Sequence, residues 1–464
     1  MGPCEVMLDR EQSRGNLLEE NLASAIHRLP NEVLMHIFVL GCPVMNHANP
    51  ILLLGERPPK HQTLVTSICR LWRELARNAP QLWRYIVLFG RIPQTKEKRE
   101  IDIQMLQSAL MFSGTLELDL VLHAGNGRTG SECEHIGALI PHLHRVRTLA
   151  VSTSSLLPLP DAPELERLRY LYIGGAGMYL PRSIIFPANA RRSPLEVFRY
   201  SLPCPLDCSL LPTSKLSSLQ IYDPTLQKNT LDIINLSSLT ELGLETGHWG
   251  VDMILSSSTL THAHLSLHRS GPQTSCLLGS LPNLRHLTVS IQDASAARPN
   301  LAWPLLPSLR SLCVTIHNHK PQGTTPYTVD LLSQAPHLVA LRIGGLEVVE
   351  VIDYLCDRWR KGIGDDGDCL RLIQIIIGYP RHDPPLHNRE DELPRMALAL
   401  QTRPLSLQTE MCIYGTRALS NWVTISDAGI IPLHGRGSQP SVALSDRAER
   451  ILQDDTIMGT HSPI

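Results

Sequence analysis

The stretch Leu281-Pro-Asn-Leu-Arg-His-Leu-Thr-Val289 returns with few changes as Leu306-Pro-Ser-Leu-Arg-Ser-Leu-Cys-Val314. After the proline, both stretches have an apolar residue, two variable residues, an apolar residue, one variable residue and an apolar residue. The alternation at the end is typical of a short strand with one buried face. The proline ends the preceding element, because it cannot donate a helical hydrogen bond. Each copy of the pattern therefore predicts a β-strand.

The pattern recurs from about residue 143 onward, and most copies begin roughly 20 to 32 residues apart. The further copies are Val146-Leu149-Val151, Leu168-Leu171-Ile173, Leu216-Leu219-Ile221, Leu239-Leu242-Leu244, Leu260-Ala263-Leu265, Leu338-Leu341-Ile343 and, less regularly, Leu370-Ile373-Ile375. Leu195-Phe198 begins one more copy, which we expect to decay at Tyr200. Helical turns are expected between copies, at Val251 to Ser256, Val329 to Ala335 and Glu347 to Arg360.

A repeat of one strand and one helix cannot bury its apolar face alone. Stacked repeats share a continuous core, which predicts a curved solenoid with a parallel sheet on its inner face. The alternative is an ordinary parallel α/β fold. The repeated prefix, with proline just before the apolar pattern, favours the solenoid.

The N-terminal region has the spacing of helices. Residues His27 to Phe38 predict a helix, because apolar residues recur four positions apart. Pro30 suits the first turn of this helix, and Glu32 favours the positive end of its dipole. A second helix with one apolar side is expected from Thr63 to Asn78, followed by an apolar cluster around Trp83.

Residues Ile101 to Leu122 connect this region to the repeats. A helix is expected from Ile103 to Phe112, ending at Ser113-Gly114. Leucines then alternate from Leu116 to Leu122, as in a strand.

The helical region resembles the F-box family. The pattern Leu-Pro-x-Glu-Val-x-x-x-Ile-Phe matches Leu29 to Phe38, Ile-Cys-Arg-x-Trp-x-x-Leu-Ala matches Ile68 to Ala76, and Leu-Trp matches Leu82-Trp83. The connection from Gly41 to Gln62 is longer than usual in that family, and Ile51 to Leu54 would supply its middle turn. The repeats resemble irregular leucine-rich-repeat domains, of the kind that often follow F-boxes. The asparagine or cysteine that this repeat family carries after the strand is mostly missing.

The F-box resemblance implies docking to the Skp adaptor of a cullin-based ubiquitin ligase. The residues expected to form the adaptor face or to support it are Leu29, Pro30, Leu34, Ile37, Ile68, Trp72, Leu75 and Trp83. Two alternatives stay open. These residues could simply pack a small three-helix core, or the helices could cap the end of the solenoid.

Composition excludes several classes of function. The 42 basic and 44 acidic residues give a net charge of -2, which argues against a dominant role in binding nucleic acid. No apolar run approaches the roughly 18 residues needed to span a bilayer, and no secretory signal is visible. The eleven cysteines are scattered, as in reduced proteins of the cytoplasm or nucleus.

No motif points to catalysis, a metal or a cofactor. The His-x-His pairs His142/His144, His262/His264 and His317/His319 would each share one face of a strand, but no third ligand is near in sequence. We expect them to be loop or repeat-edge histidines. Phosphate-loop, nucleophile-elbow and zinc-protease motifs are missing from the sequence.

The sequence therefore predicts an α/β chain, with a small N-terminal helical F-box-like module followed by an irregular leucine-rich-repeat-like solenoid. The expected divisions are a polar, partly helical segment (1–23), the F-box-like module (24–89), a connecting helix (90–112), the repeat domain (113–430) and a disordered tail (431–464). The expected function is substrate recognition in an SCF-type (Skp–cullin–F-box) ubiquitin ligase. This role needs a Skp adaptor, a cullin and an unidentified target protein, and no catalysis, cofactor, nucleic acid or membrane. The alternative is a stand-alone repeat scaffold, and a hydrolase on an α/β core is a weaker third hypothesis.

Overall fold

The computed structural model divides the chain into two compact units, Met1–Ser152 (unit 1) and Thr153–Ile464 (unit 2). The structure describes residues 25–42, 61–90, 96–124 and 138–152 of unit 1. In unit 2 it describes residues 165–174, 193–201, 211–212, 214–222, 225–226, 238–246, 248–249, 253–267, 276–291, 303–316, 327–345, 348–361, 374–378, 408–414, 420–426 and 429–432. The predictions for residues 1–23, for Ile51 to Leu54 and for the tail beyond Pro432 lie outside these ranges. None of the described helices is long and apolar enough to cross a bilayer.

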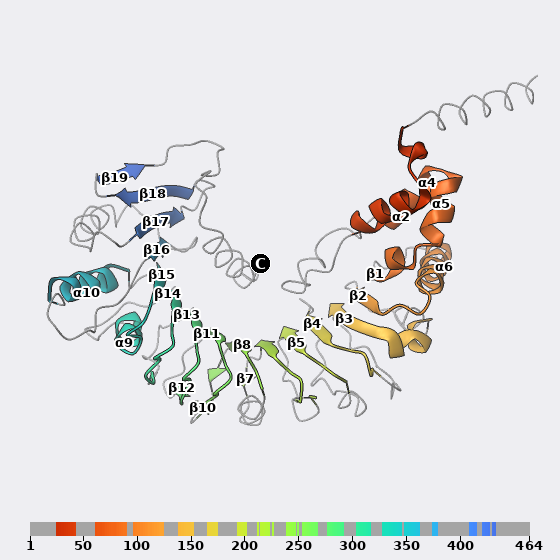
Figure 1. The fold of residues 1–464 in the computed structure, drawn as a ribbon. Coiled ribbons are helices and arrows are strands. Elements are labelled where there is room, and N and C mark those ends of the chain that lie inside the picture. The colour runs from red at the N-terminus through yellow and green to blue at the C-terminus, as the bar shows by residue number, and fades with distance from the viewer. Residues whose placement is uncertain are drawn as a thin grey trace, which may run out of the picture. The chain divides into compact units, whose positions relative to one another are not determined.

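The helical elements of unit 1 are η1 (Ala25–Arg28), α2 (Asn31–Leu40), α4 (His61–Ile68), α5 (Arg70–Arg77), η2 (Pro80–Trp83), α6 (Lys96–Phe112) and η3 (Ile140–Arg145) (Figure 1). The single helix expected from Thr63 to Asn78 was wrong, because Cys69 separates α4 from α5. The connecting helix ends at Phe112, as expected, but begins before Ile103.

Unit 1 also contains a parallel sheet in the order β1-β2-β3, with β1 (Tyr85–Gly90), β2 (Leu118–Ala124) and β3 (Val146–Ser152). Strand β1 follows the helices directly and was not foreseen. Helix α6 connects β1 to β2, and Gly114, two residues after the last residue of the helix, has a φ of 58° in the left-handed region. Arg145, only 3% exposed, donates to the carbonyl oxygens of Leu110, at 2.8 Å, and of Gly114. A buried arginine thus closes the C-terminal end of α6.

Unit 2 is a ladder of parallel strands that follow one another in sequence order (Figure 1). These strands are β4 (Tyr170–Gly174), β5 (Val197–Ser201), β6 (Ser218–Tyr222), β8 (Glu241–Thr246), β11 (His262–Leu267), β13 (His286–Ile291), β14 (Ser311–Ile316), β15 (Ala340–Gly345), β16 (Gln374–Gly378) and β17 (Gln408–Tyr414). Strands β18 (Ser420–Ser426) and β19 (Gly429–Pro432) end the sheet and pair in the antiparallel direction. The parallel solenoid compatible with leucine-rich repeats is therefore confirmed.

The apolar positions of the repeat pattern form the core of unit 2. Leu287, Leu312 and Leu341 lie in register on neighbouring strands, and each is at most 2% exposed. The same strands alternate buried and half-buried positions, as the sequence pattern predicts.

Two copies differ from the prediction. The copy at Leu195-Phe198 does not decay, because Tyr200 fills the third apolar position and is 1% exposed. The last copy was placed in the wrong register. Ile375 pairs with Leu341, which makes it the middle residue of its repeat and not the last. The proline that precedes the copies at Leu284, Leu309 and Leu338 is missing there.

The elements between strands also differ from one strand plus one helix. Val251 to Ser256 was expected to be helical, but β10 (Met253–Leu255) pairs in parallel with β12 (Cys276–Leu278). A second small sheet joins β7 (Thr225–Leu226) and β9 (His248–Trp249). Helices are confirmed towards the C-terminal end, as α9 (Tyr327–Ser333) and α10 (Val348–Lys361).

Candidate functional site on the N-terminal helices

Helix α2 has one buried and one exposed side. Pro30 is its N-cap residue, one position earlier than expected, and its carbonyl oxygen accepts from the N–H of Leu34 at 3.1 Å. Leu34 and Phe38 lie one turn apart and are at most 1% exposed. Val33 and Ile37 are also one turn apart but lie on the exposed side.

The break between α4 and α5 has a local cause. Cys69 is extended, with φ of -153° and ψ of 173°, and its Sγ accepts from the N–H of Trp72 at 3.4 Å, as an N-cap side chain does. Across the break, Nε of Arg73 donates to the carbonyl oxygen of Thr66 at 2.8 Å. The two helices therefore keep a fixed relation although the helical ladder is interrupted.

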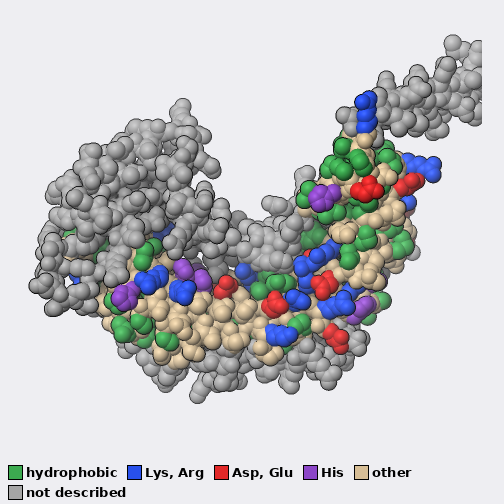
Figure 2. Space-filling model, in the orientation of Figure 1, with side chains coloured by type: hydrophobic (Ala, Val, Ile, Leu, Met, Phe, Trp, Pro, Cys, Tyr) green, Lys and Arg blue, Asp and Glu red, His purple; other side chains and the backbone are tan. Residues whose placement is uncertain are grey.

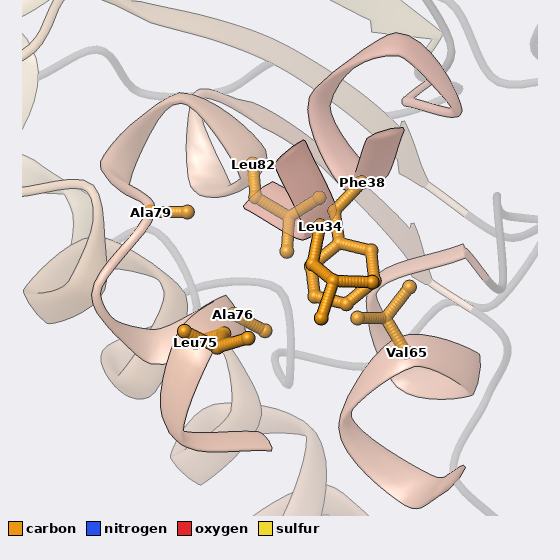
Figure 3. Close-up of a cluster of buried hydrophobic side chains, with 7 residues drawn as sticks. All are labelled: Leu34, Phe38, Val65, Leu75, Ala76, Ala79 and Leu82. Atoms are coloured by element: carbon orange, nitrogen blue, oxygen red, sulfur yellow. The ribbon is translucent and has the colours of Figure 1, made fainter. Parts of the chain in front are cut away.

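The helices share a small, closed core (Figure 3). The residues buried in it are Leu34, Phe38, Val65, Leu75, Ala76, Ala79 and Leu82. Trp72 and Trp83 pack against this core and are partly buried. The Trp72 ring lies 4.7 Å from the Phe38 ring, centroid to centroid. Nε1 of Trp83 donates to the carbonyl oxygen of Ala76 at 2.7 Å, so its polar atom is satisfied inside the packed region.

Several large apolar side chains stay outside this core. We call them the apolar surface: Ile26, Val33, Ile37, Leu40, Leu64, Ile68 and Leu71. Their exposed fractions run from 37% for Ile26 to 71% for Leu40. Figure 2 shows hydrophobic side chains gathered at the surface where Figure 1 places α2, α4 and α5. A concentration of apolar side chains on one small module is typical of a protein-binding surface.

A family model described as F-box-like matches residues 26–88. The chain carries an F-box-like domain. The match spans the helices from η1 to η2 and most of β1, so the F-box-like domain ends inside the first strand of the sheet. The expectation from the sequence is confirmed for this region. No curated protein matches the chain significantly.

The side chains of His61 and Gln62 connect elements within the F-box-like domain, and Gln62 also connects this domain to the sheet. Nε2 of His61 lies 2.8 Å from the carbonyl oxygen of Phe38, at the end of α2. Gly41 makes room for this imidazole, since a Cβ there would come within 2.5 Å of its Cε1. Gln62 donates from Nε2 to the carbonyl oxygens of Leu82 and Tyr85, at 2.8 and 2.9 Å. Helix α4 is thereby fixed to both η2 and β1.

Cys42 lies beside the core of the F-box-like domain and is poorly reactive. Its Sγ donates to the carbonyl oxygen of Leu82 at 3.5 Å. Burial raises the pKa of the Cys42 thiol to about 11, because the thiolate would lose its hydration.

The sequence-predicted site residues separate into two groups. Leu34 and Leu75 are buried in the core, and Leu29, Trp72 and Trp83 pack against it. Pro30, Ile37 and Ile68 are exposed. Contact with a partner is therefore open to the exposed group, while the buried group can support the fold.

Sequence reasoning did not include five residues of the apolar surface among the site residues: Ile26, Val33, Leu40, Leu64 and Leu71. On α2 the spacing contained the signal. Val33, Ile37 and Leu40 follow one another at intervals of four and three, which places them along one side of the helix.

The histidine pairs do not assemble a metal site within the described residues, where no group of three or more metal-ligating side chains occurs. His142 and His144 lie in η3, before β3, and not on a strand. His262 and His264 share one face of β11. His317 and His319 lie outside the described residues.

Proposed function

We propose that the chain is the substrate-recognition subunit of an SCF-type ubiquitin ligase. In this role the F-box-like domain docks the Skp adaptor and, through it, a cullin, and unit 2 binds a target protein in the cytoplasm or nucleus. The observation that carries the proposal is the apolar surface, which stays exposed on a domain whose own core is already closed.

The separation of buried and exposed residues supports docking over packing alone. Leu34 and Phe38 complete the core, so Ile37 and Leu40 on the same helix are not needed to close it. Covering a large apolar side chain contributes about 1.5–3 kcal/mol when it passes from full exposure to full burial. Several half-exposed residues on α2, α4 and α5 together can therefore support a stable interface.

Unit 2 supports the recognition half of the proposal. A parallel ladder presents a row of side chains from each strand on a rigid frame, and those residues can change without disturbing the core behind them. Ubiquitin transfer belongs to other subunits of the ligase, so this chain contributes binding and orientation and not chemistry.

The alternative, in which the N-terminal helices only cap the repeats, has one observation in its favour. Gln62 binds both η2 and β1, so the F-box-like domain and the first strand are joined. Capping does not explain why Leu64 and Ile68 are 57% and 54% exposed. A cap turns its apolar side towards the repeats and a polar side outward.

The proposal is tested by a pull-down of the full chain with purified Skp adaptor. The informative variant is Ile37→Ser with Ile68→Ser, which changes two exposed residues and leaves the core intact. Leu305→Ser is the matched control, because Leu305 is 61% exposed in unit 2. We expect the wild type and the control to bind and the double variant to lose binding while keeping its circular dichroism spectrum. A folded wild-type chain that does not retain the adaptor contradicts the proposal, and so does a double variant that binds as well as the control.

A further inference from the structure

The strands of unit 2 present a second face opposite the leucine core. We call it the polar face. It consists of the residues at alternate positions of strands β4 to β15 and of the single residue that precedes each strand. On β8 these positions are Glu241, Gly243 and Glu245. On β11, the next strand, they are His262, His264 and Ser266. The parallel register places residues of this face in straight rows across the sheet.

From β11 to β15 the described residues of the polar face are positive or neutral. Arg285 and Arg310 are both exposed, and they directly precede the neighbouring strands β13 and β14. The N–H of Arg310 donates to the carbonyl oxygen of Arg285 at 2.8 Å. Arg342, on β15, lies in register with Cys313 on β14. No aspartate or glutamate occurs at a described position of this face between Thr261 and Gly344. Figure 2 shows arginine and histidine side chains side by side where Figure 1 places these strands.

Two histidines continue the same region. His262 and His286 are paired in register, and their rings stack with centroids 4.4 Å apart and planes 10° apart. The hydroxyl of Thr261 lies 2.9 Å from Nδ1 of His262 and holds that ring in place. His286 directly follows Arg285 in sequence, so the stacked pair borders the arginines of the polar face.

His264 is only partly exposed, and one of its ring nitrogens is buried. Its Nδ1 is inaccessible to water and has no hydrogen bond. Burial lowers the pKa of His264 below 6.5, with a smaller opposing influence from Glu245, so the ring is neutral at physiological pH. A neutral imidazole has one donor and one acceptor nitrogen. An unsatisfied buried nitrogen is unfavourable, and this one lies beneath the surface of the polar face.

His264 stands between smaller residues on the two neighbouring strands. Its neighbours in register are Gly243 on β8 and Thr288 on β13, both smaller than the imidazole. The Gln220 side chain lies across Gly243, where an added Cβ would come within 2.9 Å of its Cγ. The Gln220 side chain therefore fills the space that Gly243 leaves on this face.

We propose that the polar face from β11 to β15 binds an extended peptide segment that carries aspartate or glutamate at alternate positions. This inference rests on the proposed function, because it assigns the site and chemical class of the target. The peptide carboxylates would pair with Arg285 and Arg310, because a guanidinium forms charge-assisted hydrogen bonds with a carboxylate.

The dimensions agree with this ligand. Neighbouring strands are about 4.8 Å apart, so the four strands β11, β13, β14 and β15 span about 14 Å. An extended peptide covers that distance with about four or five residues, at about 3.3 Å per residue. Alternate side chains of such a peptide point the same way, and the long arginine side chains can reach two of them.

Nucleic acid has the same charge as the proposed peptide but fits less well. Glu241 pairs in register with His262, and Glu245 lies at the other end of β8. These carboxylates border the positive region and would repel a continuous phosphate backbone. A short peptide with localised charges avoids them.

The test is fluorescence anisotropy of the purified full chain with a short labelled peptide carrying glutamate at alternate positions. The comparison probes are the same peptide with glutamine in place of glutamate and a labelled single-stranded oligonucleotide. We expect saturable binding of the glutamate peptide that weakens with salt, and at most weak binding of the two comparison probes. Equal binding of the glutamine peptide, tighter binding of the oligonucleotide, or no saturable binding overturns the proposal.

The variants identify the site. Arg285→Gln with Arg310→Gln should weaken binding about tenfold or more, because both ion pairs are lost. Arg167→Gln, an exposed arginine beside β4, is the matched control and should bind like the wild type. Equal loss in the control overturns the proposal, because it would mean that charge acts without a site.

The further inference and the proposed function can fail separately. The same preparations are tested with the Skp adaptor. Adaptor binding without peptide binding defeats only this inference, and peptide binding without adaptor binding defeats only the proposed function.

Discussion

Asp119→Asn tests whether the F-box-like domain and the strands β1 to β3 unfold together. The Asp119 carboxylate is 6% exposed, and it accepts two hydrogen bonds from Arg147 to Oδ1 and a third to Oδ2, at 3.0 to 3.1 Å. The hydroxyl of Thr148 donates to Oδ1 at 2.6 Å. Nε of Arg84, at the end of the F-box-like helices, lies 3.3 Å from Oδ2. One carboxylate thus joins three segments of unit 1.

Asparagine keeps the shape of the side chain but removes its charge. Breaking a buried ion pair costs about 3–5 kcal/mol, because the partner charge stays buried without compensation. Arg84 and Arg147 are 35% and 25% exposed and can regain some hydration, which reduces the loss to about 2–4 kcal/mol. That loss raises the open population of unit 1 about 30- to 700-fold, at 1.4 kcal/mol for each factor of ten.

Hydrogen exchange of the full chain, read by mass spectrometry, measures this population locally. We expect faster exchange in α2, α4, β1 and β2 together, and no change in β13 to β15. Glu196→Gln is the control, because its 3.6 Å pair with Arg169 is largely solvated and should contribute little. Faster exchange confined to β2, or none, would refute the coupling argument.

Three further predictions concern single side chains. Burial lowers the pKa of His264 in the folded chain, so the unfolded chain is the first to protonate this imidazole as the pH falls through 6.5. The free energy of unfolding of unit 2 should therefore decrease below that pH. Urea unfolding of His264→Leu from about pH 7 to about pH 5 should show a smaller decrease. An equal slope in that variant would contradict the assignment. Cys42, whose pKa is raised to about 11, should resist iodoacetamide at about pH 8 until the F-box-like domain unfolds. Peptide mass spectrometry measures the labelling, and labelling as fast as in urea would argue against the burial of this thiol. Gly243→Ala should destabilise unit 2 by about 1–3 kcal/mol in thermal unfolding, because the new Cβ meets the Gln220 side chain. The double variant with Gln220→Ala should recover most of this loss of stability, and no recovery would point to another cause.

The repeat ladder could be predicted because its signal is physical and periodic. A leucine every repeat, in a strand of alternating pattern, must be buried against its neighbours, and the structure places Leu287 and Leu312 side by side. The errors lie where that signal is weak. Tyr200 was taken as the point where a copy decays, yet its side chain fills the third apolar position and is buried.

The connections between strands could not be predicted as well. Val251 to Ser256 is apolar and short, and periodicity alone does not separate a short helix from a strand. Its partner β12 is more than twenty residues away in sequence, so the pairing that decides between the two is not a local property.

The sequence predicted the kind of candidate site better than it predicted the individual residues of that site. Apolar spacing identified the F-box-like helices, but the spacing does not say which side meets a neighbouring helix. Leu34 and Ile37 have similar apolar character, and only the packing of α5 and η2 against Leu34 leaves Ile37 outside. The break at Cys69 was missed because a cysteine N-cap is less common than serine, threonine, asparagine or aspartate.

Isothermal titration calorimetry of the full chain with purified Skp adaptor tests the central claim most directly. The account predicts one-to-one binding at micromolar concentration or tighter, with a negative heat-capacity change, because the apolar surface becomes covered. Ile37→Ser with Ile68→Ser should reduce both the affinity and the heat-capacity change. A folded chain that gives no binding heat at several temperatures would contradict the docking role of the F-box-like domain.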